Sequence, residues 1–265
     1  MIVETFAPDM ARTEQGWIQL PRDIERRREL FPEGVSSHPA KYNLGMVDAI
    51  VEAYSKPGDT ILDPFGGTGS AAIACLSARK TILCELEPGY VNLLKELQAK
   101  QPTWDLTVIP GDCRQTLKSI PDNSINLVIT SPPYPHLSLQ AKEGIIADRV
   151  GSGLDIAQYR GGPMNLTGIT NRFLFNKQML AVYTQIQRIL VPGGLYISIT
   201  KDSMKGNDRE LLSLEIVREA GSCGLKYTGD WWKIRQPGGM GLGNTINASK
   251  GRKVVEEEDV IVLRK

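Results

Sequence analysis

Short apolar runs alternate with helical segments between residues 60 and 130, and this alternation constrains the fold more than any other feature. We expect strands at Thr60–Asp63, Thr81–Cys84, Leu106–Ile109 and Ile125–Ile129, separated by helices at about residues 69–79, 88–100 and 112–119. Strand–helix–strand repetition gives parallel pairing with right-handed crossovers. The sequence therefore predicts an α/β fold with a doubly wound, Rossmann-like and mostly parallel sheet.

The pattern extends to both sides of this region. A helix at about Leu44–Ser55 shows apolar residues at helical spacing and precedes the first strand. After it we expect a helix at 176–189, a turn at Val191–Gly194, a strand at Leu195–Ile199, a helix at Asp208–Ala220, and strands at Leu225–Ile234 and Val260–Leu263. The last two strands are consecutive, which favours an antiparallel C-terminal hairpin.

A chain of 265 residues can bury the core of one large domain. We expect an N-terminal arm at residues 1–35, with a charged helix at Asp23–Leu30, and a main domain at 36–265. Two glycine-rich stretches, 135–176 and 236–253, have no sustained periodicity and are expected as irregular insertions. Insertions of this length in a compact domain tend to be functional.

Several classes of protein are disfavoured by what the sequence lacks. The first residues do not have the basic-then-apolar pattern of a signal peptide, and no run approaches a membrane span, so we expect a cytoplasmic protein without a membrane partner. The cysteines are scattered, and only His38 and His136 could join them, so neither a metal site nor a disulfide framework is expected.

The formal net charge is +1, which is low for a protein that binds nucleic acid through general electrostatics. Any such binding must use local basic patches. The first group we expect on a solvent-exposed helix surface, and the other two fall in the insertions or beside them. The three groups are Arg22 with Arg26–Arg28; Arg149, Arg160, Arg172 and Lys177; and Lys250, Arg252 and Lys253.

A glycine-rich loop, Asp63–Ser70 (DPFGGTGS), joins the first predicted strand to an alanine-rich helix. Glycine permits positive φ and close approach of the backbone, and a helix N-terminus offers unpaired N–H groups. The loop suits a small anionic or zwitterionic ligand. Alone it is a weak signal, because tight turns can have the same composition.

A second loop, Thr130–Tyr134 (TSPPY), follows the strand Ile125–Ile129. Neither proline has an N–H, and the residue before each proline is driven toward extended geometry. Ser131 and Pro132 therefore form a rigid set of acceptors with an aromatic ring beside it. Such a loop can hold a flat group with an NH2 on one edge, as in a nucleobase, although a simple proline-rich turn is the alternative.

Together DPFGGTGS and TSPPY resemble the S-adenosylmethionine-dependent DNA amino-methyltransferases, which methylate the exocyclic nitrogen of cytosine or adenine. The resemblance covers roughly residues 36–265, and the serine of the tetrapeptide is most similar to the cytosine-N4 branch. It implies a Rossmann-like methyltransferase sheet and a catalytic motif of Ser131, Pro132, Pro133 and Tyr134.

The resemblance also implies which residues bind the cofactor, S-adenosyl-L-methionine. His38 and Lys41, in the segment HPAKY, would border its methionine end, with Asp63 near the amino group. Glu85 would accept from the ribose hydroxyls, with Glu87 as a rival, and Asp112 from the adenine amino group, unless Asp112 is only a helix N-cap. The remaining predicted cofactor residues are Pro64, Phe65, Gly66, Gly67, Thr68, Gly69, Ser70 and Cys113.

The implied reaction is transfer of a methyl group to N4 of a cytosine flipped out of double-stranded DNA, with Tyr134 stacked on the base. Serine also occurs in some adenine-N6 enzymes, so adenine is an alternative, as is an RNA base. A glutamine-modifying protein methyltransferase or a regulator that only binds the cofactor fits the motifs less well. Candidate partners are DNA, a second copy of the chain and, in a restriction-modification pair, a cognate endonuclease.

Overall fold

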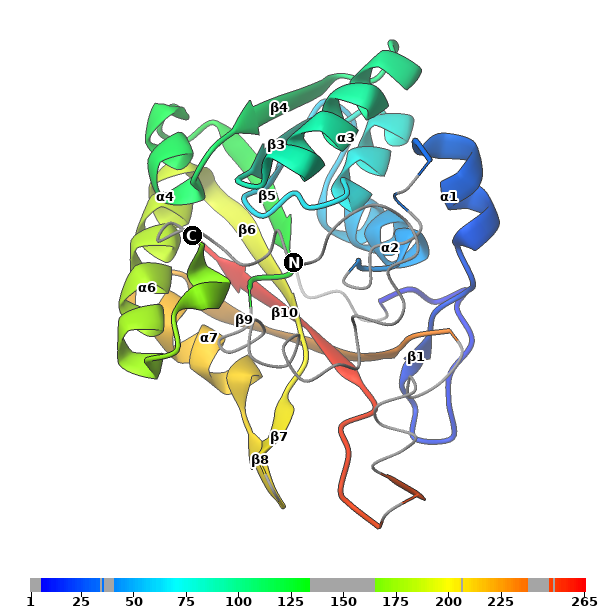
Figure 1. Cartoon of the computed structure of the whole chain (residues 1–265), viewed down its shortest axis with the longest axis vertical. Coiled ribbons are helices and arrows are strands. Elements are labelled where there is room, and N and C mark those ends of the chain that lie inside the picture. Colours follow the sequence, from blue (N-terminus) through cyan, green and yellow to red (C-terminus); the bar gives the residue numbers. More distant parts are fainter. Residues whose placement is uncertain are drawn as a thin grey trace.

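The computed structural model describes residues 6–33, 35, 41–133, 165–205, 207–237, 248–249 and 251–265. Within them, one sheet has eight strands in the order β1-β9-β10-β6-β5-β2-β3-β4 (Figure 1). The strands are β1 (Ile18–Gln19), β2 (Thr60–Asp63), β3 (Lys80–Glu85), β4 (Leu106–Pro110), β5 (Ile125–Thr130), β6 (Leu190–Thr200), β9 (Lys226–Arg235) and β10 (Glu258–Arg264).

The sheet is parallel from β4 through β3, β2 and β5 to β6. β10 is antiparallel both to β6 and to β9, and the short β1 extends the far edge in parallel to β9. The predicted doubly wound, mostly parallel sheet with an antiparallel C-terminal hairpin is confirmed.

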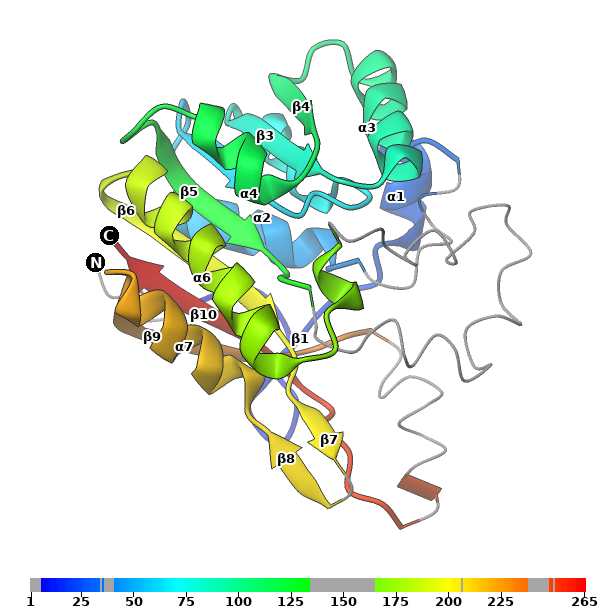
Figure 2. The same cartoon turned by 60° about the vertical axis from the view of Figure 1, so that its left-hand side comes forward.

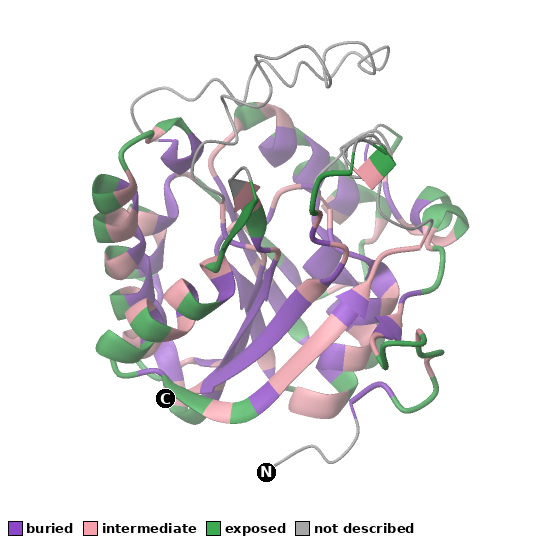
Figure 3. Ribbon diagram, turned by 90° about the horizontal axis from the view of Figure 1, so that it is seen from below, coloured by how far each residue is buried: buried purple, intermediate pink, exposed green. Residues whose placement is uncertain are grey.

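Helices cover both faces of the sheet, as Figure 2 shows. One core contains α2 (Leu44–Tyr54), the 3-10 helix η2 (Ser70–Ser77) and α3 (Pro88–Lys100); the other contains α4 (Cys113–Thr116), the 3-10 helix η3 (Leu117–Ser119), α6 (Arg172–Ile189) and α7 (Leu212–Ser222). Buried residues are concentrated in the strands between these layers, and exposed residues lie on the outer sides of the helices (Figure 3). This arrangement leaves the ends of the strands accessible.

The described part of the N-terminal arm packs into this domain. β1 pairs with β9 through Ile18 opposite Ile234, and the helix α1 (Ile24–Leu30) follows. Phe6 is 1% exposed, and its ring lies 5.8 Å from that of Tyr54 and 5.6 Å from that of Trp232. Apolar side chains therefore bind the arm to the main core.

Several predicted boundaries are wrong. Asp208–Glu210, expected as the start of a helix, is the strand β8, which pairs with β7 (Ser203–Lys205) in a separate hairpin. The Arg209 guanidinium in that strand pairs with Asp202 at 2.8 Å and with Glu257 at 3.0 Å. These long-range ion pairs hold the segment extended against its local tendency.

Two further differences concern glycine and helix starts. Val191–Gly194, expected as a turn, lies within β6, where the register against β5 shifts and Gly193 adopts a φ of 79°. The last part of the segment expected to be irregular, 135–176, contains the 3-10 helix η7 (Leu166–Gly168) and the start of α6. The Asn171 side chain caps α6 by accepting from the backbone N–H of Leu174. The helix therefore begins at Arg172, before the expected start at about residue 176.

Candidate cofactor and catalytic site

A cavity of about 990 Å³ lies at the carboxyl ends of the parallel strands. Both predicted loops border it, and so do the ends of β3 and β4. The predicted site residues that line it are Lys41, Pro64, Phe65, Gly66, Gly67, Thr68, Ser70, Glu85, Asp112, Cys113, Ser131, Pro132 and Pro133. Residues spread over more than ninety positions of the chain are thus brought together at one site.

Among the described residues, two predicted site residues do not line the cavity. Asp63 and Gly69 lie behind the lining, in contact with the core. His38 and Tyr134 lie outside the described residues, as do His136, Arg149, Arg160 and Lys250. Most of the two segments expected as insertions, 135–164 and 238–247, also lies outside them.

The glycine loop requires glycine at two positions. Gly69 has a φ of 85°, and a Cβ there would lie 2.7 Å from Cδ2 of Leu94. A Cβ on Gly66 would lie 3.0 Å from Cβ of Leu83, on the neighbouring strand. The loop therefore packs tightly onto β3 and α3, and its backbone forms the wall of the cavity.

Asp63 connects the two predicted loops. Its carboxylate is fully buried and accepts from the Phe65 backbone N–H at 2.9 Å, from Thr130 Oγ1 at 2.7 Å and from the Tyr42 hydroxyl. Thr130 directly precedes Ser131, and Phe65 lies in the glycine loop. Burial raises the pKa of Asp63, although the three hydrogen bonds oppose this effect. One carboxylate therefore fixes the two loops relative to each other.

Glu85 lies at the end of β3 with both carboxylate oxygens fixed by backbone donors. Oε2 accepts from Gly67 N–H at 2.6 Å, and Oε1 accepts from Glu87 N–H at 2.7 Å. Burial raises the pKa of Glu85 to about 7, against the effect of these hydrogen bonds. The Leu86 backbone N–H also acts on this carboxylate, which still has acceptor capacity for a ligand hydroxyl because a carboxylate can accept about four hydrogen bonds. The rival, Glu87, also lines the cavity, where its carboxylate accepts from the Asn165 amide at 2.7 Å.

Asp112 is the N-cap of α4, accepting from the Arg114 backbone N–H at 2.9 Å. The Arg114 guanidinium also pairs with this carboxylate and contacts Gln178 on α6. The capping role considered for Asp112 is therefore present, while the residue still lines the cavity. Burial raises the pKa of the neighbouring Cys113 thiol well above its usual range, so this thiol is protonated near neutral pH.

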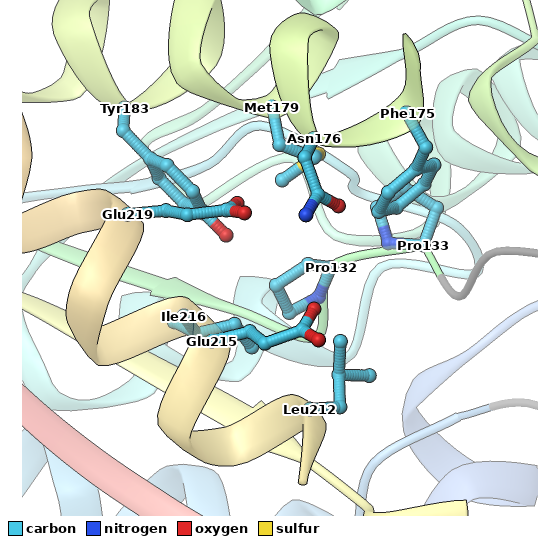
Figure 4. A pocket seen from close by; sticks show the side chains of 10 residues that line it. All are labelled: Pro132, Pro133, Phe175, Asn176, Met179, Tyr183, Leu212, Glu215, Ile216 and Glu219. Atoms are coloured by element: carbon cyan, nitrogen blue, oxygen red, sulfur yellow. The ribbon is translucent and has the colours of Figure 1, made fainter. Parts of the chain in front are cut away.

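Pro132 and Pro133 are held between two helices. Figure 4 shows Phe175, Asn176, Met179 and Tyr183 projecting from α6 and Leu212, Glu215, Ile216 and Glu219 from α7, around the two prolines. Arg172 on α6 pairs with Glu215 on α7 and ties the helices together. The loop thus has rigid packing on its far side, in addition to the restriction that proline imposes on its backbone.

Arg27, in α1, was missed by sequence reasoning. It was expected on a solvent-exposed surface, but it is 1% exposed and borders the cavity, so the prediction is wrong for this residue. Its guanidinium donates to Asp23 at 2.9 Å, to Ser70 Oγ at 3.1 Å and to the Tyr42 carbonyl at 2.6 Å. The charge pattern of ERRREL does not distinguish the buried arginine from its exposed neighbours; the only signal is that Phe31 follows at i+4.

The cavity has charges of opposite sign at two of its borders. Arg27 and Lys41 lie at one, where burial and then the Arg27 charge lower the pKa of Lys41. Glu85 lies at another. Thr68, in the glycine loop, also lines the cavity, and its buried hydroxyl has no hydrogen-bond partner within the described part of the chain. The site therefore offers a cationic border, a carboxylate border and an unused hydroxyl, which fits a zwitterionic nucleoside such as S-adenosylmethionine.

Among the described residues, no three His, Cys, Asp or Glu side chains are grouped so as to hold a metal ion. None of the helices that they form is long and apolar enough to cross a membrane.

Solved structures first identify the class of fold. TrmN from Thermus thermophilus superposes with a TM-score of 0.51 at 14% identity, over 86% of this chain and 50% of that chain. Geranyl diphosphate methyltransferase superposes with a TM-score of 0.54 at 11% identity, over 83% of this chain and 78% of that chain. At these identities the likeness concerns the fold alone, which is that of the Rossmann-like methyltransferases.

Sequence relatives then narrow the class. A family model described as DNA methylase, N6_N4_Mtase, matches residues 8–96. DNA adenine methyltransferase YhdJ of Escherichia coli is 39% identical over 74 residues, 27% of this chain and 24% of that protein. Type II methyltransferase M.BglI of Bacillus subtilis is 40% identical over 57 residues, which are 21% of this chain and 16% of that protein.

These matches confirm the resemblance to the DNA amino-methyltransferases without separating the N4 branch from the N6 branch. They also bear out S-adenosylmethionine as the predicted cofactor. The matched part of the chain spans about a quarter or less of the length of the two curated relatives. The family model begins at residue 8, so the match includes most of the N-terminal arm, which the motifs alone did not reach.

Proposed function

We propose that the protein is an S-adenosylmethionine-dependent DNA methyltransferase that transfers a methyl group to the exocyclic N4 of a flipped-out cytosine. The observation that carries the proposal is the single cavity bordered by both loops, with Asp63 bonded to each of them. A methyl donor in the glycine loop and an amino group at Ser131 would share this cavity. The family match supports the same chemistry.

The cofactor would be held by the end of β3, the glycine loop after β2, the helix α1 and the segment that precedes α2. Glu85 accepts the ribose hydroxyls on the lone pairs that its backbone donors leave, and Thr68 supplies a hydroxyl from the glycine loop. Arg27 and Lys41 place positive charge where the methionine carboxylate would lie. When bound, S-adenosylmethionine supplies a methyl group on a sulfonium sulfur.

Ser131 and Pro132 would activate the amino group of the base. This nitrogen is a poor nucleophile because its lone pair is delocalised into the ring. When Ser131 Oγ and the Pro132 carbonyl each accept one amino hydrogen, the nitrogen becomes more tetrahedral and its lone pair becomes available. The N–CH3 bond forms as the S–CH3 bond breaks, the electron pair of that bond stays on sulfur, and one amino proton leaves to solvent. Fixed acceptors stabilise the positive charge that develops on nitrogen.

Several features of the proposal rest on the resemblance. Tyr134 stacks on the flipped base, and the segments 135–176 and 236–253 contact DNA. His38, Pro64, Phe65, Gly66, Gly67, Gly69, Ser70, Asp112 and Cys113 complete the cofactor pocket, with Asp63 behind it. The enzyme would act in the cytoplasm, as a homodimer if one copy provides too little surface for DNA, and beside a cognate restriction endonuclease if it protects a restriction site.

Adenine-N6 is the second candidate. The serine of the tetrapeptide favours cytosine, whereas the relative YhdJ is named as an adenine methyltransferase. An RNA base remains the third candidate, and preference for structured RNA over DNA would identify it.

Methyl transfer from labelled S-adenosylmethionine to unmethylated genomic DNA, with the product nucleosides separated, tests the proposal. N4-methylcytosine is the expected product. N6-methyladenine would retain the mechanism and overturn the choice of base. Label in neither base, with the cofactor demonstrably bound, would overturn the DNA substrate.

A further inference from the structure

Three polar residues lie together at the border of the cavity away from the glycine loop. Lys201 follows the end of β6, Glu258 begins β10 and Gln236 follows the end of β9, and all three line the cavity. Thr200 pairs with Asp259, so Lys201 and Glu258 occupy the next position of the same antiparallel ladder. Strand pairing therefore places residues from three separate parts of the chain side by side.

Contacts within this group fix its geometry. Gln236 Nε2 donates to Glu258 Oε2 at 2.9 Å, and Lys201 Nζ donates to the Glu256 carbonyl at 3.5 Å. Burial raises the pKa of Glu258, while the Gln236 hydrogen bond and the positive charge of Lys201 act in the opposite direction. The Gln236 amide is thus bonded to the Glu258 carboxylate, and the positive charge of Lys201 lies near enough to this carboxylate to act on its pKa.

The position of the group relative to Ser131 indicates what it contacts. β5, which Ser131 follows, lies between β2 and β6 in the sheet. The loops proposed to bind the cofactor follow β2, β3 and β4, which lie on one side of β5, and Arg27 on α1 donates to Ser70 at the end of the first of these loops. A base whose amino group is held at Ser131 needs its own part of the cavity, and the part left for its ring is beyond the ends of β6, β10 and β9.

The chemistry of the group suits one edge of cytosine. Next to the amino group, cytosine has two successive acceptors, N3 and O2, whereas adenine has N1 followed by a C–H. Ser131 and Pro132 supply acceptors for the amino hydrogens, and Lys201 supplies an ammonium with three donors. Acceptors followed by a cationic donor match the pattern of cytosine better than that of adenine.

Resting on the proposed function, we infer that Lys201 recognises the N3 and O2 edge of the target cytosine and that Glu258 and Gln236 position it. Lys201 is then a residue that determines base specificity, outside both sequence motifs. The inference concerns the base alone and is independent of the DNA sequence around it.

Lys201→Met tests this role, with Lys233→Met as the matched control. Lys233 lies on β9, its side chain is 40% exposed and paired with both Glu257 and Asp259, and it is not part of the cavity lining. On a duplex that carries the site mapped from methylated genomic DNA, Lys201→Met should lower kcat/KM by about 10- to 100-fold. The Kd for S-adenosylmethionine, measured by calorimetry, should change less than about twofold, and Lys233→Met should leave both quantities unchanged.

A base analogue separates recognition from a merely structural effect. The target cytosine is replaced by 3-deazacytosine, which keeps the amino group and lacks N3. The wild type should be much less active on this duplex than on the cytosine duplex. Lys201→Met should be nearly as active on one duplex as on the other, because its contact with N3 is already absent. Equal losses in the two proteins, unchanged activity of Lys201→Met on cytosine, or an adenine product would each overturn the inference. Absence of methyl transfer by the wild type to any DNA would instead overturn the proposed function.

Discussion

The two halves of the cavity are built in different ways. The half at β2, β3 and β4 uses backbone turns and strand-end carboxylates within one stretch of the chain, Asp63–Cys113. The half at β6, β9 and β10 uses long side chains, Lys201, Gln236 and Glu258, that converge from distant positions. The first half can be recognised in a sequence because its chemistry is local, and the second becomes visible only when the strands are paired.

Substitution of Arg27 has the largest expected effect on stability. Arg27 belongs to the half of the cavity at β2, β3 and β4, although it lies far from Asp63–Cys113 in the chain. Arg27→Met should lower the free energy of unfolding by about 3–5 kcal/mol, because the Asp23 carboxylate loses its buried partner and Ser70 and Tyr42 lose a donor. Urea unfolding measures this change. Affinity for S-adenosylmethionine should fall more than affinity for its decarboxylated analogue.

Arg26→Met is the control for this experiment. Arg26 is on the same helix but pairs with Asp48 at the surface, with the two side chains 38% and 44% exposed. Its loss should cost less than about 1 kcal/mol and leave both affinities unchanged. Equal destabilisation by the two substitutions would show that Arg27 contributes no more than a surface cation.

Ser131→Ala tests the boundary between the halves. Removing one of the two fixed acceptors should lower kcat for methyl transfer by about 10²- to 10³-fold. The Kd for S-adenosylmethionine should stay within about twofold, because Ser131 is assigned to the base and not to the cofactor. Ser119→Ala, in an exposed serine that donates to the Thr116 carbonyl, is the matched control. Unchanged turnover in Ser131→Ala would refute the role assigned to the serine.

Gly69→Ala tests the packing of the glycine loop. The new Cβ would lie 2.7 Å from Leu94, in a backbone with a φ of 85°, so we expect a loss of about 1–3 kcal/mol in stability together with weaker cofactor binding. Gly58→Ala is a close control, since Gly58 has a φ of 88° and its Cβ would meet nothing within 4 Å. Because both substitutions place alanine at a positive φ, the difference between their urea midpoints measures the clash with Leu94 alone. Equal midpoints would mean that the glycine loop or Leu94 moves to accommodate the Cβ at little cost.

Glu85 predicts a pH dependence with opposite signs for binding and stability. With its pKa raised to about 7, the carboxylate protonates below that pH, and affinity for S-adenosylmethionine should weaken there as an acceptor is lost. The native state binds this proton more tightly than the unfolded chain, so the contribution of Glu85 to stability falls as pH rises from about 4 to 7. Calorimetry and urea unfolding across this range measure both trends.

Glu85→Gln should remove both trends. At pH 8 it should weaken S-adenosylmethionine binding by about tenfold, because an amide offers a single acceptor oxygen where the ribose meets a carboxylate in the wild type. Glu96→Gln is the control, since Glu96 is exposed on α3 and is not part of the cavity lining. A wild-type affinity that is constant between pH 5 and 8 would contradict the assignment of Glu85.

The sequence predicted the local features well and the long-range ones poorly, for physical reasons. α3 was predicted over the residues that it occupies, because Pro88 and its apolar spacing are local signals. β8 was expected as helix because its ion pairs, from Arg209 to Asp202 and Glu257, cannot be read from neighbouring residues. Arg27 was expected at the surface for the same reason: its partners Ser70 and Tyr42 are distant in the chain.

The most direct test of the divided cavity is a crystal structure with bound S-adenosylhomocysteine. We expect its ribose hydroxyls within hydrogen-bond distance of Glu85 and its carboxylate beside Arg27, with the part of the cavity at Lys201 and Glu258 left for the base. A ligand found against Lys201 and Glu258, away from the glycine loop, would contradict the account.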